Sequence, residues 1–149
     1  MSKVSVRPVS VDDRAEWDVL YQAYAAFYNV TQTVEMRDTV WAWLHDEAKE
    51  SRGLVALNAD GKLIGLTHFR PFARPLSATT GCFLDDLFVS PDARGTGCAD
   101  VLIDGVRAIA AREGWSVVRW ITAENNYRGR ALYDRVATKT NWVTYDIKV

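Results

Sequence analysis

The sequence predicts a mixed α/β domain, in which helices cover both faces of one largely antiparallel, twisted sheet. The first observation is the order of the expected elements, β-α-α-β-β-β-α-β-α-β. Three consecutive strands between residues 52 and 89 favour an antiparallel meander. The strand–helix–strand unit of residues 79–122 favours a parallel pair with a right-handed crossover, which makes the sheet mixed.

Size and composition indicate one folded domain over residues 1–149. The chain is 48% hydrophobic and 25% charged, and it is long enough to bury a core. Its net charge of −1 gives no basic footprint for nucleic acid. The sequence has no long apolar run and no signal-peptide core, so we expect a cytoplasmic protein that does not bind membranes. Cys82 and Cys98 lack metal-ligand spacing, so no metal is expected.

The first elements are an edge strand and an aromatic helix. Residues 4–9 alternate in polarity and contain a proline, which is typical of an edge strand. Apolar side chains recur at helical spacing over residues 17–28 and predict an amphipathic helix. The start of this stripe is expected in the core and comprises Trp17, Leu20 and Tyr21. Its end forms either core or the wall of a substrate pocket and comprises Tyr24, Phe27 and Tyr28.

Turn residues divide the rest of the chain into shorter elements. The sequence Asn-Ala-Asp-Gly at 58–61 predicts a hairpin turn, Gly65 indicates a bulge, and Gly114 ends a helix. The expected elements are helices over 34–49, 97–113 and 126–138, strands over 52–57, 62–70, 79–89, 116–122 and 142–149, and a loop over 71–77.

A glycine loop that opens a helix is the most informative stretch. Arg94-Gly95-Thr96-Gly97 follows a strand and precedes the helix of residues 97–113. Glycine lets backbone N–H groups come close to a ligand, and the first N–H groups of a helix have no partner inside it. Together with the helix dipole and the Arg94 guanidinium, they indicate a site for a phosphate-type anion.

Two known phosphate-loop patterns do not fit this stretch. No Lys-Ser or Lys-Thr follows the glycines, which excludes the P-loop. Asp100 stands where the dinucleotide pattern needs its last glycine. The pattern that fits is R-x-x-G-x-A, formed by Arg94, Gly97 and Ala99, and it resembles the pyrophosphate loop of the GNAT superfamily of acetyl-CoA-dependent N-acetyltransferases.

A second segment resembles the same superfamily. In that family an Asn stands at the mouth of the last helix, with a small residue three positions on and a Tyr seven positions on. Here these places are taken by Asn126, Gly129 and Tyr133. The usual Gly-Phe after the Tyr is replaced by a longer connection that ends at Trp142.

The resemblance implies a GNAT-like fold with acetyl-CoA as the cosubstrate. Two parallel strands, ending near Val89 and Thr122, would splay apart, and the pantetheine amides would pair with the exposed backbone between them. The residues implied in cosubstrate binding are Leu87, Phe88, Val89, Arg94, Gly95, Thr96, Gly97, Cys98, Ala99, Asn126 and Tyr133.

The resemblance also implies the chemistry of direct acetyl transfer to an amine. The amine must lose a proton and the leaving thiolate must gain one. Tyr133 takes the family's position beside the thioester sulfur and is the expected acid. Asp85 and Asp86 are the candidate bases. Because neighbours on a regular strand point to opposite faces, only one of them should enter the site, and Asp85 is preferred.

Three further side chains receive no catalytic role. His45 and His68 are lone histidines, which are more often structural. Cys98 lies in the anion loop, where helix N–H groups should lower its pKa. We interpret it as a packing residue with incidental reactivity.

Two classes of function remain. The first is an N-acetyltransferase for a primary amine, which could be a small amine, a polyamine, an amino acid or the amine of a peptide or protein. The second is a non-catalytic module that binds acyl-CoA as a sensor. A nucleotide-binding domain is a distant third. Tyr133 and the pair Asp85 and Asp86 favour the enzyme. The aromatic helix and the same two carboxylates favour a cationic amine as the substrate.

The strand expected at the C-terminus could pair across a homodimer.

Overall fold

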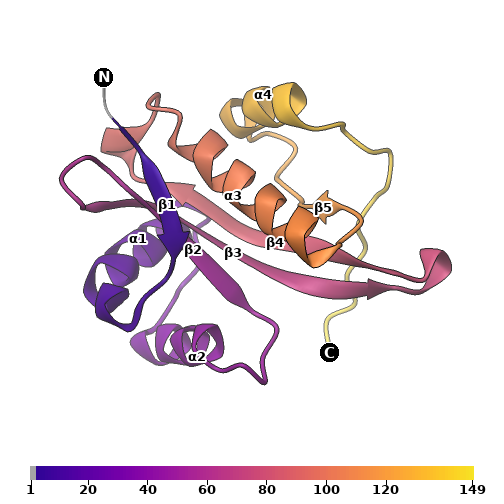
Figure 1. Ribbon diagram of the computed structural model, residues 1–149, viewed down its shortest axis with the longest axis horizontal. Coiled ribbons are helices and arrows are strands. Elements are labelled where there is room, and N and C mark those ends of the chain that lie inside the picture. Colours follow the sequence, from indigo (N-terminus) through magenta and orange to yellow (C-terminus); the bar gives the residue numbers. More distant parts are fainter. Residues whose placement is uncertain (1–2) are drawn as a thin grey trace.

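The computed structural model describes residues 3–149 and contains one five-stranded mixed sheet (Figure 1). The strands lie in the order β1 to β5, with bounds Ser5–Pro8, Arg52–Leu57, Leu63–Arg74, Thr79–Val89 and Val118–Arg119. Neighbouring strands are antiparallel except for the parallel pair β4–β5. The mixed α/β fold predicted from the sequence is therefore confirmed.

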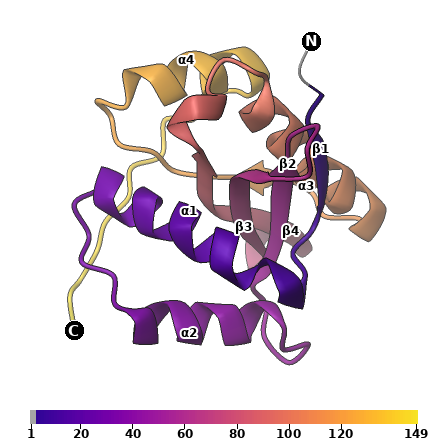
Figure 2. The same ribbon diagram turned by 90° about the vertical axis from the view of Figure 1, so that its left-hand side faces the viewer.

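Helices cover both faces of this sheet (Figures 1 and 2). On one face lie α1, Arg14–Phe27, and α2, Val34–Leu44, and on the other lies α3, Cys98–Glu113. The fourth helix, α4, spans Tyr127–Val136 and stands beside the carboxyl end of β4. None of the helices in residues 3–149 has the length and apolar character needed to cross a membrane.

The core has two layers, one on each face of the sheet. Trp17, Leu20 and Tyr21 of α1 are buried against the sheet, as their spacing predicts. On the opposite face, Leu102 and Val106 of α3 are fully buried. The sheet is thus closed on both sides along most of its length, which leaves the carboxyl end of β4 as the place where a ligand can enter.

Two irregularities in the sheet affect the site. The pairing of β2 with β3 shifts beside Gly65, where a bulge was predicted. A Cβ at Gly65 would lie 2.9 Å from the Cys98 sulfur, so β3 passes close beneath the start of α3. The pairing of β3 with β4 also shifts between His68 and Phe69, which leaves Asp85 as an extra residue in β4. This second bulge was not predicted.

Four elements differ from their predicted bounds by more than two residues. The first is α2, which ends at Leu44 and not at residue 49. β3 continues through Pro71 to Arg74, because β2 pairs with it only as far as Phe69 and the remaining residues form an edge that tolerates proline. β5 is limited to two residues, because β4 and β5 diverge beyond Phe83. The strand expected over 142–149 is not formed, since those residues have no backbone partner among the described strands.

Candidate active site

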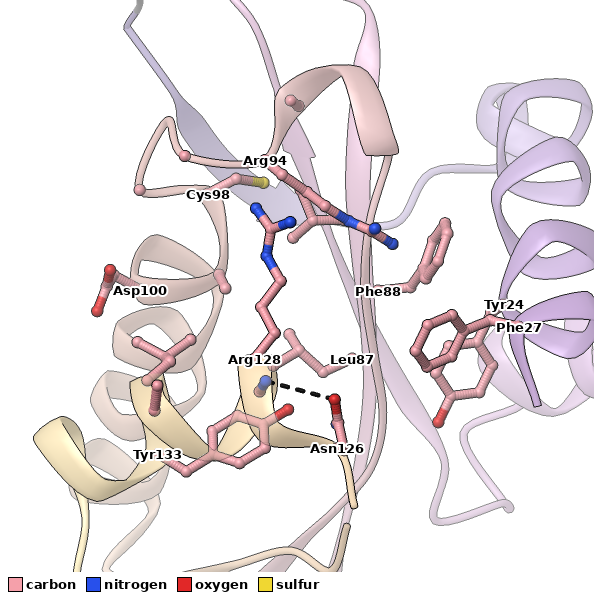
Figure 3. Close-up of a pocket in the computed structure, with 18 of the residues that line it drawn as sticks. Tyr24, Phe27, Leu87, Phe88, Arg94, Cys98, Asp100, Asn126, Arg128 and Tyr133 are labelled. Carbon is pink, nitrogen blue, oxygen red and sulfur yellow. Dashed lines mark hydrogen bonds between the residues drawn. The ribbon is translucent and has the colours of Figure 1, made fainter. Parts of the chain in front are cut away.

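A cavity of about 560 Å³ opens between the carboxyl end of β4, the glycine loop, α4 and the end of α1 (Figure 3). Tyr24, Phe27 and Tyr28 form its aromatic wall, and Tyr24 also packs against the core on the α1 face. The other predicted residues in its lining are Leu87, Phe88, Val89, Arg94, Gly95, Gly97, Cys98, Ala99, Asn126 and Tyr133. Thr96, Asp85 and Asp86 are not part of this lining.

The glycine loop has the geometry of an anion cradle. Gly95 and Gly97 have φ values of +83° and +82°, in the left-handed region that favours glycine. A Cβ at either position would meet no protein atom within 4 Å, so the space in front of the loop is open. Among residues 3–149, no side chain caps the N-terminus of α3, which leaves its first N–H groups available to an anion.

Two guanidinium groups approach this cradle from different elements. Arg94 lies in the loop, 6.0 Å from the Phe88 ring. Arg128 extends from α4 toward Arg94 across the pocket (Figure 3). Arg128 was not predicted as a binding residue from the sequence. Its position two residues after Asn126, at the start of the last helix, could have indicated that it lies near the site. A pair of guanidinium groups beside uncapped N–H groups suits a ligand with more than one negative charge.

The acidic residue in this region does not oppose an anion directly. Asp100 lies in the first turn of α3 and accepts a hydrogen bond of 3.3 Å from Arg135 of α4. Its carboxylate points away from the middle of the pocket (Figure 3). The Arg135 contact therefore offsets its charge and ties α4 to α3.

The divergence of β4 from β5 leaves a row of backbone groups without a strand partner on that side. The two strands pair only at Cys82 with Val118 and Phe83 with Arg119. Beyond Phe83, β4 continues to Val89 along the cavity, with β3 as its only strand neighbour in residues 3–149. Amide groups of an extended ligand could pair with these N–H and C=O groups.

Asn126 fixes the start of α4. Its side-chain oxygen accepts a hydrogen bond of 3.3 Å from Gly129 N–H, and its side-chain nitrogen donates one of 2.9 Å to the Thr122 hydroxyl. A Cβ at Gly129 would lie 2.5 Å from the Asn126 side-chain nitrogen. The small residue three positions after Asn126 is therefore required by this cap.

Tyr133 projects from α4 into the cavity. Its ring packs edge-on against Trp120, with centroids 5.4 Å apart, and its hydroxyl points into the pocket (Figure 3). Burial raises the pKa of the Tyr133 phenol above its usual range. The phenol therefore stays protonated and can donate a proton to a group in the cavity.

The sequence predicted that the helix N–H groups lower the pKa of Cys98, and this prediction is wrong. Its sulfur is buried beneath α3, close to Gly65, and burial raises the pKa of the Cys98 thiol to about 11. The loss of hydration outweighs the attraction of the helix N-terminus. The interpretation of Cys98 as a packing residue agrees with this burial.

The bulge at Asp85 changes the geometry of the acidic pair. Asp86 accepts hydrogen bonds from Tyr21 of α1 and from His68, so it lies on the α1 face. Asp85 accepts from Arg70, which lies two residues after His68 and therefore on the same face. The premise that the two carboxylates point to opposite faces of the sheet is wrong, because the extra residue breaks the alternation of β4.

The two carboxylates have opposite electrostatic environments. Burial raises the pKa of Asp85 above its usual range, although the Arg70 guanidinium works in the other direction. Burial also acts to raise the pKa of Asp86, but hydrogen bonds from His68, Tyr21 and Tyr24 outweigh it and hold that pKa below its usual range. Asp85 is therefore the better proton acceptor, and Asp86 is a persistent anion.

A buried chain of hydrogen bonds holds Asp86 in place. The Trp17 indole N–H donates to His68 Nε2 at 3.0 Å, and His68 Nδ1 lies 2.8 Å from Asp86. Because an indole only donates, His68 Nε2 must carry a lone pair, and the ring proton is on Nδ1. Sequence reasoning left His68 unassigned, since Trp17 lies 51 positions away and nothing local connects them.

We expect Asp86→Asn to lower the free energy of unfolding at pH 7 by about 1.5–3 kcal/mol, because it removes the negative charge that strengthens the hydrogen bonds from Tyr21 and His68. The pKa of Asp86 in the folded protein lies below its value in the unfolded chain. The Asp86 carboxylate therefore stabilises the fold above the unfolded pKa, and this stabilisation is lost as pH falls through the folded pKa. In urea unfolding from pH 7 to pH 3, the free energies of unfolding of the two proteins should converge. Asp104→Asn, at an exposed pair on α3, is the control. Equal stability at pH 7 would contradict the network.

Comparison with known proteins identifies the class. Residues 17–137 match the model of the acetyltransferase (GNAT) family. The chain therefore belongs to the GNAT family, and it is an acyltransferase enzyme, which confirms the resemblance inferred from its loop and last helix.

Individual relatives agree with this assignment. The chain is 28% identical to the D-amino-acid N-acetyltransferase HPA3 of Saccharomyces cerevisiae, over 96% of this chain and 89% of that protein. The solved ribosomal-protein-alanine N-acetyltransferase of Brucella melitensis biovar Abortus 2308 is 26% identical, with a TM-score of 0.77 over 99% and 100% of the two chains. AAC(6')-Iy, solved with a CoA-based bisubstrate analogue, shares the fold at 18% identity, with a TM-score of 0.82 over 99% of both chains.

The GNAT family uses acetyl-CoA. The geometry of the cavity also suits acetyl-CoA, because an open glycine cradle, two guanidinium groups and a stretch of β4 without a partner on the β5 side all line it. Within residues 3–149, no group of three or more His, Cys, Asp or Glu side chains could hold a metal ion.

Proposed function

We propose that residues 1–149 work as a single domain that transfers the acetyl group of acetyl-CoA directly to the primary amine of a small molecule. The observation that carries the proposal is the order of groups along one cavity. The anion cradle lies at one end, Tyr133 projects into it, and the aromatic wall of α1 lies opposite Tyr133. The relative that acts on D-amino acids supports an amino acid as the acceptor.

The residues of the chain have distinct roles in this proposal. Acetyl-CoA supplies an activated acetyl group as a thioester. Arg94, Arg128 and the loop N–H groups would hold its phosphates, and backbone groups of residues 87–89 would pair with its amides. Tyr133 would donate a proton to the leaving sulfur.

The amine side of the pocket has its own set of roles. Asp85 would accept a proton from the substrate ammonium through a water molecule, because its side chain lies outside the cavity lining. Asp86 would attract that ammonium as a fixed charge behind Tyr24. The aromatic wall would contribute cation–π attraction to the same ammonium.

The proposed function is tested by following thiol release from acetyl-CoA with a panel of amines. The panel contains matched D- and L-amino acids, spermidine, an N-terminal peptide and an aminoglycoside. We expect amine-dependent thiol release and an acetylated amine by mass spectrometry. Stabilisation by CoA in a thermal melt, without turnover of any amine, would contradict transfer while retaining cosubstrate binding.

We expect Arg94→Ala to raise the KM for acetyl-CoA by roughly 10- to 100-fold, because a charge-assisted hydrogen bond is worth about 1.5–3 kcal/mol. Gly97→Val should do more harm, since a branched side chain is strained at positive φ and also blocks the approach of a phosphate. Gly61→Val is a matched control, because Gly61 has φ +80° and open space but lies in the hairpin turn. An unchanged KM in Arg94→Ala would contradict the loop assignment.

A further inference from the structure

Arg70 of β3 lies beside Asp85 where the buried part of the sheet ends. Residues 63–69 of β3 are buried, and Arg70 is the first residue after them that is not. Its Nε donates hydrogen bonds of 3.3 Å and 3.1 Å to the two carboxylate oxygens of Asp85. The side chains of Arg70 and Asp85 are 36% and 34% exposed, so a small molecule can reach both of them from the α1 face.

The outer part of the Arg70 guanidinium has no acceptor of its own. Within residues 3–149, its Nε is the only nitrogen of the side chain that has a hydrogen-bond partner. The guanidinium carbon also lies 5.0 Å from the ring centroid of Phe83, the residue opposite Arg70 in the sheet. A guanidinium that is held at Nε and against a ring directs its remaining N–H donors outward as a fork, which is the geometry that binds a carboxylate.

Phe72 and Phe83 form an aromatic surface next to Arg70. Their rings pack edge-on with centroids 6.2 Å apart, and both residues are half-buried. Arg119 of β5 lies at the other end of this surface, with its guanidinium carbon 5.6 Å from the Phe72 centroid. Two guanidinium groups therefore flank one aromatic pair, and this part of the face attracts an anion and repels a second ammonium.

The direction of β4 places these groups in a row that leads to the cavity. Phe83, with Arg70 opposite, comes first, Asp85 follows, and Val89 lines the cavity. An amine that is oriented toward the cavity from beside Asp85 therefore leaves the rest of its molecule on the Arg70 side.

A free α-amino acid has charges that match this row. Its ammonium nitrogen and its carboxylate carbon are only about 2.5 Å apart, as bond lengths require. An ammonium beside Asp85 therefore brings the carboxylate beside Arg70, and the charges of protein and substrate alternate in sign. Spermidine, an aminoglycoside and the N-terminus of a peptide have no carboxylate next to the reacting amine, and the first two bring further positive charge toward Arg70.

We propose that Arg70 binds the carboxylate of the acceptor, so that the substrate is a free α-amino acid whose side chain rests on Phe72 and Phe83. This inference rests on the proposed function, because it concerns the acceptor of the same transfer. In that transfer the amine nitrogen forms the amide bond as the thioester C–S bond breaks, and Arg70 neither forms a bond nor takes a proton. Arg70 is therefore a specificity-determining residue.

The test compares amino acids with their amides, which keep the amine and the side chain but lack the carboxylate charge. The substrates are alanine and phenylalanine, each as both enantiomers, and the matching amides. We expect Arg70→Gln to lower the ratio of kcat/KM for amino acid over amide by roughly 10- to 100-fold, the loss expected for one charge-assisted hydrogen bond. Arg70→Gln also removes the guanidinium that acts to lower the pKa of Asp85, but this change in the base affects both substrates and leaves the ratio intact.

Arg74→Gln is the matched control. Arg74 ends the same strand, but it donates a hydrogen bond of 2.7 Å to Ser116 and not to Asp85, so the ratio should equal that of the wild type. Turnover of the amides by Arg70→Gln shows that this variant is folded.

Three results would overturn the inference. An equal fall of kcat/KM for amino acid and amide, or no fall at all, would leave Arg70 as a structural partner of Asp85. A wild type that acetylates spermidine or an aminoglycoside but none of the amino acids would contradict Arg70 as a carboxylate site, while the proposed transfer stands. A wild type that acetylates no amine at all would instead contradict the proposed function, and this inference with it.

Discussion

Replacing Tyr133 by Phe is expected to lower kcat about 10²-fold, while the Kd for CoA stays within a factor of two. The substitution keeps the ring against Trp120 and removes only the hydroxyl, which is the proton that we assign to the leaving sulfur. Because burial raises the pKa of this phenol, the wild-type group is protonated across the working pH range. Steady-state kinetics and calorimetric titration of CoA measure the two quantities separately.

Tyr127→Phe is the matched control for this change. Tyr127 begins the same helix and is 75% exposed, so its hydroxyl has no role in the site. Its kcat should equal that of the wild type. If Tyr133→Phe kept full kcat, Tyr133 would be a packing residue and the acid would have to be water or another group.

Replacing Asp85 by Asn is expected to lower kcat/KM about 10²-fold at neutral pH, because the substrate ammonium loses its proton acceptor. The deficit should shrink as pH rises above the pKa of the substrate's own ammonium, since the amine then reacts without a base. Initial rates from pH 6 to pH 10 test this dependence. The raised pKa of Asp85 predicts that the wild-type acidic limb lies above the usual range of an aspartate.

Asp86→Asn, measured over the same pH range, separates the two carboxylates. A fixed anion contributes to attraction of the ammonium, so its loss should act mainly on the KM of the amine and on stability. If instead the pH-dependent loss followed Asp86 and Asp85→Asn were silent, the roles of the two residues would be exchanged.

The sequence was most informative where structure depends on neighbouring residues. The glycine loop, the start of α3 and the cap at Asn126 are local, because left-handed φ values and helix N-terminal hydrogen bonds involve residues only a few positions apart. The bounds of β4, Thr79–Val89, were predicted for the same reason, since Ser90-Pro91 breaks the strand.

The features that could not be predicted depend on contacts between distant residues. The bulge at Asp85 is defined by the register against His68 and Phe69, which no pattern within β4 reveals. The role of His68 rests on an indole from α1. The prediction of a strand over residues 142–149 is wrong for the described structure, because a strand forms only where a backbone partner is present.

The close passage of β3 beneath α3 has a consequence for how such a site can vary among relatives. At Gly65 an added Cβ would stand 2.9 Å from the Cys98 sulfur and 3.1 Å from both Leu102 and the Phe88 carbonyl oxygen. A larger residue there must displace the Cys98 and Leu102 side chains, which support the first turns of α3 beneath the cradle. Position 65 should therefore covary with position 98 across homologues, and a residue that never touches the cosubstrate would set the height of the surface on which its phosphates rest.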